Sequence, residues 1–196
     1  MPRQESKKSK REGFTIIEVV LVLAIAGLIF LMVFVALPAL QRSQRDTARR
    51  NDVARVDTSL TQYQTNHQDS PSTLPKDGSW DPTDDEQKNG TITCSSTNIN
   101  PACEFVRDYM NSGTTGEADK PKKNEFKDPD GTYYHVNIAT QGSTEFSYPG
   151  GDKMDYVIYI RTGAKCKDDK AIQDTKRHYA VLYRLEGAGV YCIDDQ

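Results

Sequence analysis

The carboxylate of Glu18 lies inside a long apolar segment, where a charged group needs a compensating partner. It is the most informative chemical feature of this sequence. From Val19 to Leu37 the chain has nineteen consecutive apolar or glycine residues, which is long enough for a helix that spans a bilayer. An acidic side chain within such a segment costs roughly 2.5–3.5 kcal/mol on insertion scales and usually marks a functional position. The position of Glu18 therefore predicts ion pairing with a positive group.

The residues before this segment form a basic leader that ends at Gly13. Residues 1–13 carry five basic and two acidic side chains, so the positive-inside rule predicts that they stay in the cytoplasm and that the chain after Leu40 is exported. A general secretory signal has a shorter apolar stretch, followed by a cleavage site of small residues. Here the candidate processing point precedes the apolar run, at the bond between Gly13 and Phe14.

The basic leader, the glycine and the run Phe14-Thr-Ile-Ile-Glu18 before a long apolar helix resemble the class III signal of type IV prepilins and pseudopilins. The likeness covers about the first 55 residues, and the rest agrees in layout. It implies that prepilin peptidase cuts after Gly13 and methylates the amine of Phe14. In a filament of such subunits the buried Glu18 needs a positive partner, and the nearest is the cationic Phe14 amine of a neighbouring copy.

The same resemblance implies partners and a location. The expected partners are other copies of the chain in a helical filament, prepilin peptidase, an assembly ATPase, a membrane platform protein, and a host-surface or DNA ligand. The precursor is expected to cross the cytoplasmic membrane once, and the assembled subunit to lie in an extracellular pilus on the cell surface.

Phe14 and Glu18 are expected to lie at the start of one long helix. The sequence predicts a transmembrane or filament-core helix over 14–40 and an amphipathic continuation over 41–66. Pro38 removes a backbone donor and is expected to kink this helix. Apolar residues at helical spacing along the continuation predict the face that meets the folded domain: Val53, Val56, Leu60 and Tyr63.

Arginine and aspartate residues are interleaved along the continuation of the helix. They are Arg42, Arg45, Asp46, Arg49, Arg50, Asp52, Arg55 and Asp57. The sequence leaves two interpretations open. These charges pair between subunits of a filament, or they form a solvated helix face with pairs inside the helix.

The remainder of the chain predicts a loop region followed by a sheet. Residues 67–131 show no sustained periodicity, apart from a short helix near 101–111 that begins at Asn100-Pro101 and ends at Gly113. Residues 132–196 contain four segments rich in Val, Ile and Tyr: 132–139, 154–161, 178–185 and 189–193. The expected fold class is therefore α+β, with a long N-terminal helix packed against a C-terminal antiparallel sheet of about four strands, as in the pilin fold.

The four cysteines all fall on the side expected to be exported. An even count there favours two disulfides. Of the three possible connectivities we favour Cys94–Cys103 and Cys166–Cys192. Zinc binding is the competing interpretation, but no Cys-x-x-Cys pair is present.

Two shorter patterns have weak functional interpretations. The run Asp128-Pro-Asp130-Gly131, together with Asp168 and Asp169, offers oxygen ligands for calcium, but the run also suits a type I turn and lacks the full calcium-loop spacing. We favour a turn without metal. Asn89-Gly-Thr91 matches the short glycosylation sequon. No cofactor is expected.

The sequence shows no phosphate-binding loop and no zinc-protease helix, so an enzyme is not expected. The chain without residues 1–13 carries 20 Lys and Arg against 26 Asp and Glu, a net charge of −6, which argues against a dedicated nucleic-acid binder. The expected function is a structural pilin subunit that serves adhesion, twitching motility or DNA uptake. The alternatives are a pseudopilin of a type II secretion or competence system, and a membrane-anchored binding protein that does not polymerise.

Overall fold

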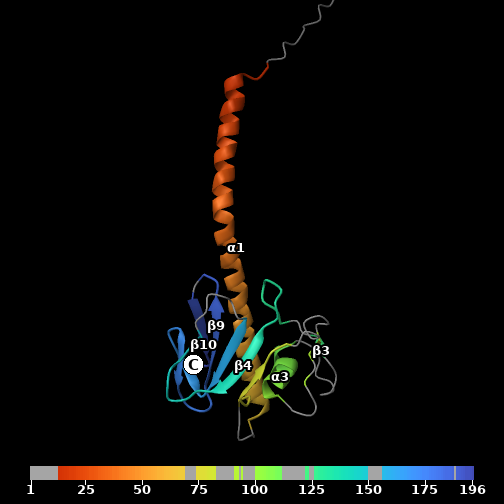
Figure 1. Cartoon of the computed structure of the whole chain (residues 1–196), viewed down its shortest axis with the longest axis vertical. Coiled ribbons are helices and arrows are strands. Elements are labelled where there is room, and N and C mark those ends of the chain that lie inside the picture. Colours follow the sequence, from red (N-terminus) through yellow and green to blue (C-terminus); the bar gives the residue numbers. More distant parts are fainter. Residues whose placement is uncertain are drawn as a thin grey trace, which may run out of the picture. The chain divides into compact units, whose positions relative to one another are not determined.

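The computed structural model describes residues 13–68, 74–82, 91–92, 94, 100–111, 122–123, 126–149, 156–187 and 189–196, with the backbone alone at residues 91, 122 and 123. The chain divides into two compact units, Met1–Gln41 and Arg42–Gln196. Helix α1 (Ile16–Asn66) contributes residues to both units, and Figure 1 shows it in red to brown. Each unit is described by itself below.

In the first unit α1 exposes its apolar side chains on all sides. Large apolar residues from Phe14 to Leu40 have exposed fractions between 42% and 89%. By length and composition α1 is able to cross a membrane. A helix that is apolar all round requires lipid or other helices around it. Pro38 lies inside α1, which is helical on both sides of it, and the expected kink stays a prediction.

The second unit is built on a five-stranded sheet with the order β1-β4-β6-β9-β10. The strands are β1 (Gly78–Trp80), β4 (His135–Thr140), β6 (Val157–Thr162), β9 (Tyr179–Leu185) and β10 (Gly189–Asp194). Neighbouring strands are antiparallel except β4 and β6, which run parallel. The predicted fold class, a long N-terminal helix on an antiparallel-rich sheet, is confirmed.

Smaller elements surround this sheet. They are a three-stranded sheet of β5 (Phe146–Ser147), β8 (Lys170–Gln173) and β7 (Ala164–Lys167), a pair of β2 (Thr91–Ile92) and β3 (Lys122–Lys123), helix α3 (Pro101–Phe105) and the π-helical turn η1 (Val106–Met110). The side chain of Asn100 accepts from the amide of Ala102 at 3.0 Å, so α3 begins at the predicted cap. Gly113 lies outside the described residues, and β1 falls in the range for which the sequence predicts a loop.

The apolar stripe on the second half of α1 packs against the sheet, as predicted. Val53, Val56 and Leu60 are 0–1% exposed, and Tyr63 is partly buried against the same core. The sheet contributes alternate side chains from its central strands: Val136, Ile138, Ile158, Ile160, Val181 and Tyr183. Burying each such side chain contributes about 1.5–3 kcal/mol, so this contact is the main force that holds the helix to the sheet.

Two disulfides cross-link the second unit. Cys94 is bonded to Cys103 in α3, and Cys166 in β7 is bonded to Cys192 in β10. These are the two pairs that we favoured from the sequence. The second bond joins the small sheet to the last strand of the main sheet, across a separation of 26 residues.

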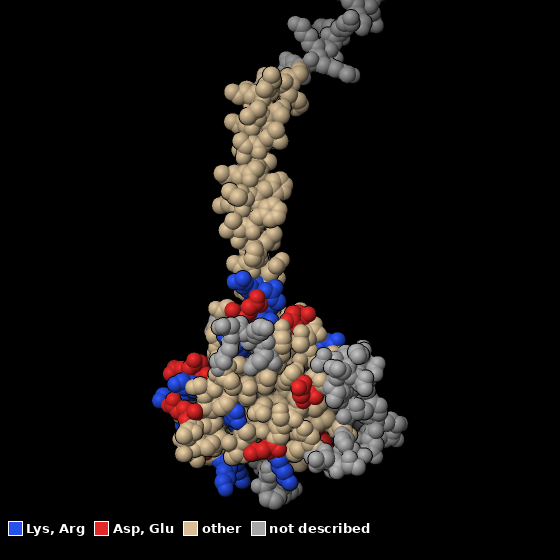
Figure 2. All heavy atoms as spheres, in the orientation of Figure 1, with Lys and Arg blue, Asp and Glu red and all other residues tan. Residues whose placement is uncertain are grey.

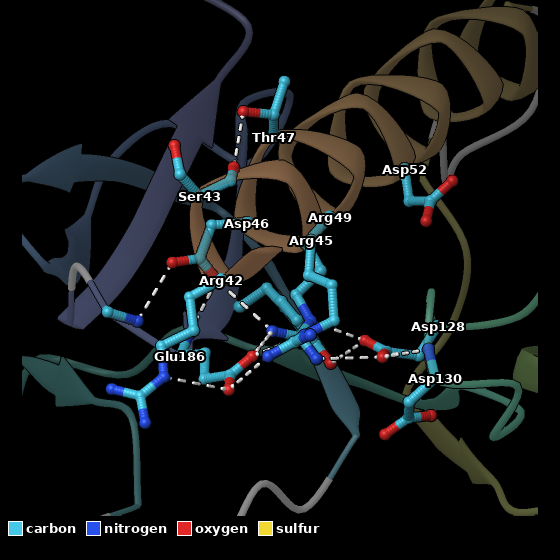
Figure 3. Close-up of polar contacts among 12 residues, drawn as sticks. Arg42, Ser43, Arg45, Asp46, Thr47, Arg49, Asp52, Asp128, Asp130 and Glu186 are labelled. Carbon is cyan, nitrogen blue, oxygen red and sulfur yellow. Dashed lines mark hydrogen bonds and ion pairs between the residues drawn. The ribbon is translucent and has the colours of Figure 1, made fainter. Parts of the chain in front are cut away.

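A buried ion pair fixes α1 to the loop before β4. Arg49, whose side chain is 2% exposed, donates from Nε to Oδ2 of Asp128 at 2.7 Å and from Nη2 to Oδ1 at 2.9 Å. The hydroxyl of Tyr183 donates to the same carboxylate, and hydrogen bonding to Asp128 raises the pKa of Arg49 above its usual value. Figure 3 shows both side chains pointing toward each other. In an ion pair with so little access to water, each charge is stable only while the other charge is present.

The turn between β9 and β10 is tied to the same part of α1. Asp46 accepts the backbone amides of Glu186 and Gly187 at 2.8 and 2.9 Å. Arg45 donates two hydrogen bonds of 2.8 Å to the carboxylate of Glu186, and Nη1 of Arg49 lies 3.2 Å from it. Arg45, Asp46 and Arg49 therefore pair mainly with the sheet of their own chain, which neither of the two interpretations had foreseen. One pair inside the helix is present as well, because Nη1 of Arg49 lies 3.2 Å from Oδ1 of Asp46.

Replacing Arg49 by Met leaves the carboxylate of Asp128 buried without its cation. We expect the free energy of unfolding to fall by about 3–5 kcal/mol, the usual cost of breaking a buried pair. Denaturant unfolding of the full chain in detergent measures it. Arg42 is the matched control, since its side chain is 64% exposed and lies 3.8 Å from Glu186. Arg42→Met should change stability by less than about 1 kcal/mol. Equal effects of the two variants would contradict the structural role of Arg49.

The carboxylate of Glu186 predicts an acid-sensitive contribution to stability. Hydrogen bonds from Arg45 and then Arg49 lower its pKa from the ordinary 4.5 to about 2. Because the folded-state pKa is the lower one, the ionised carboxylate stabilises the fold above pH 4.5, and this contribution disappears as the pH falls toward 2. As the pH is lowered across this range, the midpoint temperature of thermal unfolding should fall more steeply for the natural chain than for Glu186→Gln. Glu145→Gln, at an exposed carboxylate, should keep the natural slope.

Candidate functional site

The Gly13–Phe14 bond precedes the first helical residue. α1 begins at Ile16, and residues 13–15 are exposed and not helical. A Cβ built on Gly13 would meet no atom within 4 Å, so the described part of the chain does not itself require glycine there. The Gly13–Phe14 bond is therefore accessible and lies outside the helix.

Thr15 and Glu18 close the first turn of α1. Oε2 of Glu18 accepts the backbone amide of Thr15 at 2.9 Å and its hydroxyl at 2.7 Å. This is one half of a capping box, in which the third residue of a helix returns to the amide of the capping residue. This role of Thr15 was not predicted, although the pattern Thr-x-x-Glu before an apolar run indicates it. The helix dipole also favours the negative charge at this end.

Glu18 keeps an unused acceptor. Both hydrogen bonds from Thr15 reach Oε2, and within the described residues Oε1 has no hydrogen-bond partner. Glu18 and Val22 are four residues apart and share one side of the helix. Together with Val19, Leu23 and Phe14, which precedes the helix, they line a shallow groove. The side chain of Phe14 is 89% exposed. The arrangement presents a carboxylate oxygen beside an apolar groove.

The candidate metal ligands belong to the second unit. Residues 128–131 form a turn in which the amide of Gly131 donates to the carbonyl of Asp128 at 2.8 Å, and Asp128 itself is paired with Arg49. Asp168 and Asp169 occupy the turn between β7 and β8. Among described residues, no group of three or more His, Cys, Asp or Glu side chains is arranged to hold a metal. Asn89 lies outside the described residues.

Comparison with known families identifies the N-terminal segment. Residues 8–34 match the family model of the prokaryotic N-terminal methylation motif. The match includes the Gly13–Phe14 bond, the capping residue Thr15 and Glu18, and it supports a type IV pilin-like prepilin, as the sequence predicted. No curated protein and no solved structure matches the chain. The motif and the apolar helix fit a membrane-anchored precursor.

The capping contact predicts a local effect of Glu18→Ala. Removing the carboxylate leaves the amide of Thr15 without its acceptor, so exchange of this amide in detergent micelles should accelerate about fivefold, the equivalent of a cap worth ~1 kcal/mol. Hydrogen exchange followed by NMR measures it. Val22→Ala, one helical turn further on, should leave the Thr15 amide unchanged. Unaltered protection in Glu18→Ala would show that the contact does not persist in the anchored chain.

Proposed function

We propose that this chain is the structural subunit of a type IV pilus-like filament. Prepilin peptidase cuts between Gly13 and Phe14 and the new amine of Phe14 is methylated. The observation that carries the proposal is the methylation motif at residues 8–34, combined with a Glu18 carboxylate that has one oxygen capped by Thr15 and the other unused.

In this proposal, Oε1 of Glu18, which has no partner among the described residues, drives assembly. In lipid the cap from Thr15 reduces the cost of keeping Glu18 ionised, but a single capped oxygen leaves the charge uncompensated. A neighbouring subunit brings the positive amine of its own Phe14, whose ordinary pKa keeps it protonated at neutral pH. The pair then forms between chains, and because it is head-to-tail it repeats from subunit to subunit as a helical filament.

The apolar half of α1 supplies the cohesion. Its side chains are exposed on every side of the helix, so they can exchange lipid for the same face of other copies, through close packing rather than through a net hydrophobic gain. The second unit has its own core and two disulfides, which suits a part that works outside the cell. A cytoplasmic assembly ATPase and a membrane platform protein would extract the subunits from the membrane.

The test separates the charge of Glu18 from its cap. Glu18→Gln keeps an oxygen that accepts from Thr15 but has no charge, whereas Glu18→Ala loses both. Filaments sheared from cells carrying the natural chain should yield subunits that begin at methylated Phe14 by mass analysis. Both Glu18 variants should be cut but stay in the membrane fraction, since neither carries the negative charge for an ion pair with the Phe14 amine. Gly13→Val should keep the leader and also stay in the membrane.

Glu145→Gln serves as the control, because it removes a carboxylate from an exposed loop of the second unit, and it should reach the sheared fraction normally. If Glu18→Gln assembles like the natural chain while Glu18→Ala does not, capping is the whole role of Glu18 and the proposed ion pair is overturned. An uncut leader in the natural chain would favour an anchored binding protein that does not polymerise.

A further inference from the structure

Arg42 is the first charged residue after the apolar segment of α1. The twenty-two residues 19–40 carry no charge, and Glu18 stands directly before them. At 1.5 Å per residue a helix of this length rises about 33 Å, which matches the hydrocarbon layer of a bilayer at about 30 Å. When Glu18 lies at one boundary of this layer, Arg42, two residues after Leu40, lies in the polar layer at the other.

A short polar collar follows Leu40 on the helix and consists of Gln41, Arg42, Ser43 and Gln44. All four residues are exposed, and with 3.6 residues per turn they go once round the helix. Figure 2 shows the uncharged surface of the apolar segment and the blue and red side chains that begin where it ends. Four residues rise about 6 Å, and the headgroup layer on each side of a bilayer is about 5–7 Å thick. The polar collar therefore matches this layer in polarity and in length.

The guanidinium of Arg42 is only weakly engaged by the rest of its own chain. Its side chain is 64% exposed, and its Nε lies 3.8 Å from Oε1 of Glu186, which is too far for a hydrogen bond. The carboxylate of Glu186 already accepts two hydrogen bonds of 2.8 Å from Arg45 and one of 3.2 Å from Arg49. In Figure 3 the terminal nitrogens of Arg42 point away from this cluster. Among the described residues, none accepts a hydrogen bond from Arg42.

Helix geometry and the length of arginine both suit a contact at the membrane surface. The bond from Cα to Cβ of a helical residue tilts toward the N-terminus of the helix, which for Arg42 is the direction of Leu40. Arginine also lays its methylene groups along apolar surface while its charged end stays in the polar layer. Arg42 can therefore reach the phosphate level of the headgroup layer without taking its charge into hydrocarbon.

We propose that Arg42 binds the phosphate group of a membrane phospholipid and that this contact fixes the depth of the anchored chain. The planar guanidinium matches two oxygens of a phosphate. The side-chain amides of Gln41 and Gln44 offer further donors to the same headgroup layer. The inference rests on the membrane-anchored precursor of the proposed function and does not depend on filament assembly. A subunit that leaves the membrane has to break this contact.

The test uses the full chain in lipid nanodiscs of two compositions. One contains phosphatidylcholine, and the other contains digalactosyldiacylglycerol, a lipid without phosphate. Solid-state NMR measures the dipolar coupling between the Cζ carbons of ¹³C-labelled arginine and lipid ³¹P. In phosphatidylcholine the natural chain should show the coupling of one arginine that Arg42→Gln has lost. The signals of the other arginines are common to both chains and cancel in the difference.

Arg177→Gln is the matched control, because it removes an exposed arginine from a turn of the second unit, and it should keep the full coupling of the natural chain. A second comparison needs no substitution at Arg42. The Arg42 Nε–H resonance of the natural chain should differ between phosphatidylcholine and the galactolipid. Inorganic phosphate added to the galactolipid nanodiscs should not restore the position seen in phosphatidylcholine, since the contact requires a phosphate held at the membrane surface.

Three results would overturn the proposal: equal coupling in the natural chain and Arg42→Gln, an Arg42 resonance that is the same in both lipids, or full restoration by inorganic phosphate. The last result would mean that Arg42 takes a free anion and not a lipid. Extraction of the natural chain from vesicles with alkaline carbonate separates these failures from failure of the anchor itself. A chain that stays in the vesicles without the coupling contradicts only the phosphate contact, whereas a chain that is released contradicts the membrane-anchored precursor as well.

Discussion

The buried guanidinium of Arg49 is the interaction on which the arrangement of the folded unit depends. It joins α1 to Asp128, which lies 79 residues away, and to Glu186, which lies 137 residues away. Hydrophobic packing of the helix stripe is strong but has little directional preference, so it would tolerate a helix shifted along the sheet. A charge with almost no access to water must keep its partners in place. The ion pairs therefore set the register in which the apolar stripe meets the sheet.

Helix α1 has to satisfy two different surroundings along its length. Its second half buries one face against a sheet and uses its remaining charges to hold two turns. Its first half has apolar side chains all round, and there the carboxylate of Glu18 is the exception. The cap with Thr15 shows how that carboxylate is accommodated in a single chain, and the proposed assembly depends on the oxygen left over.

Helices and strands were predictable from the sequence where the apolar periodicity extends over many residues or where a capping residue marks the start of a helix. The stripe on α1, the helix after Asn100 and the four main strands were found in this way. β1 was missed because three residues cannot display alternation, and β7 and β8 because they are short and rich in lysine. The parallel pairing of β4 with β6 was also missed, since alternation states which face is buried but not in which direction a strand runs. The long connection of residues 141–156 makes the crossover possible.

The sequence by itself determined the methylation motif at residues 8–34, the apolar helix with Glu18 near its start, the apolar face of its continuation and the α+β class. These properties depend on neighbours within a few residues, where spacing alone decides which side chains share a face. The tertiary structure decided which arginines are buried and the order and direction of the strands. Those outcomes depend on contacts between residues far apart in the chain, and such contacts exist only once the loops have brought the elements together.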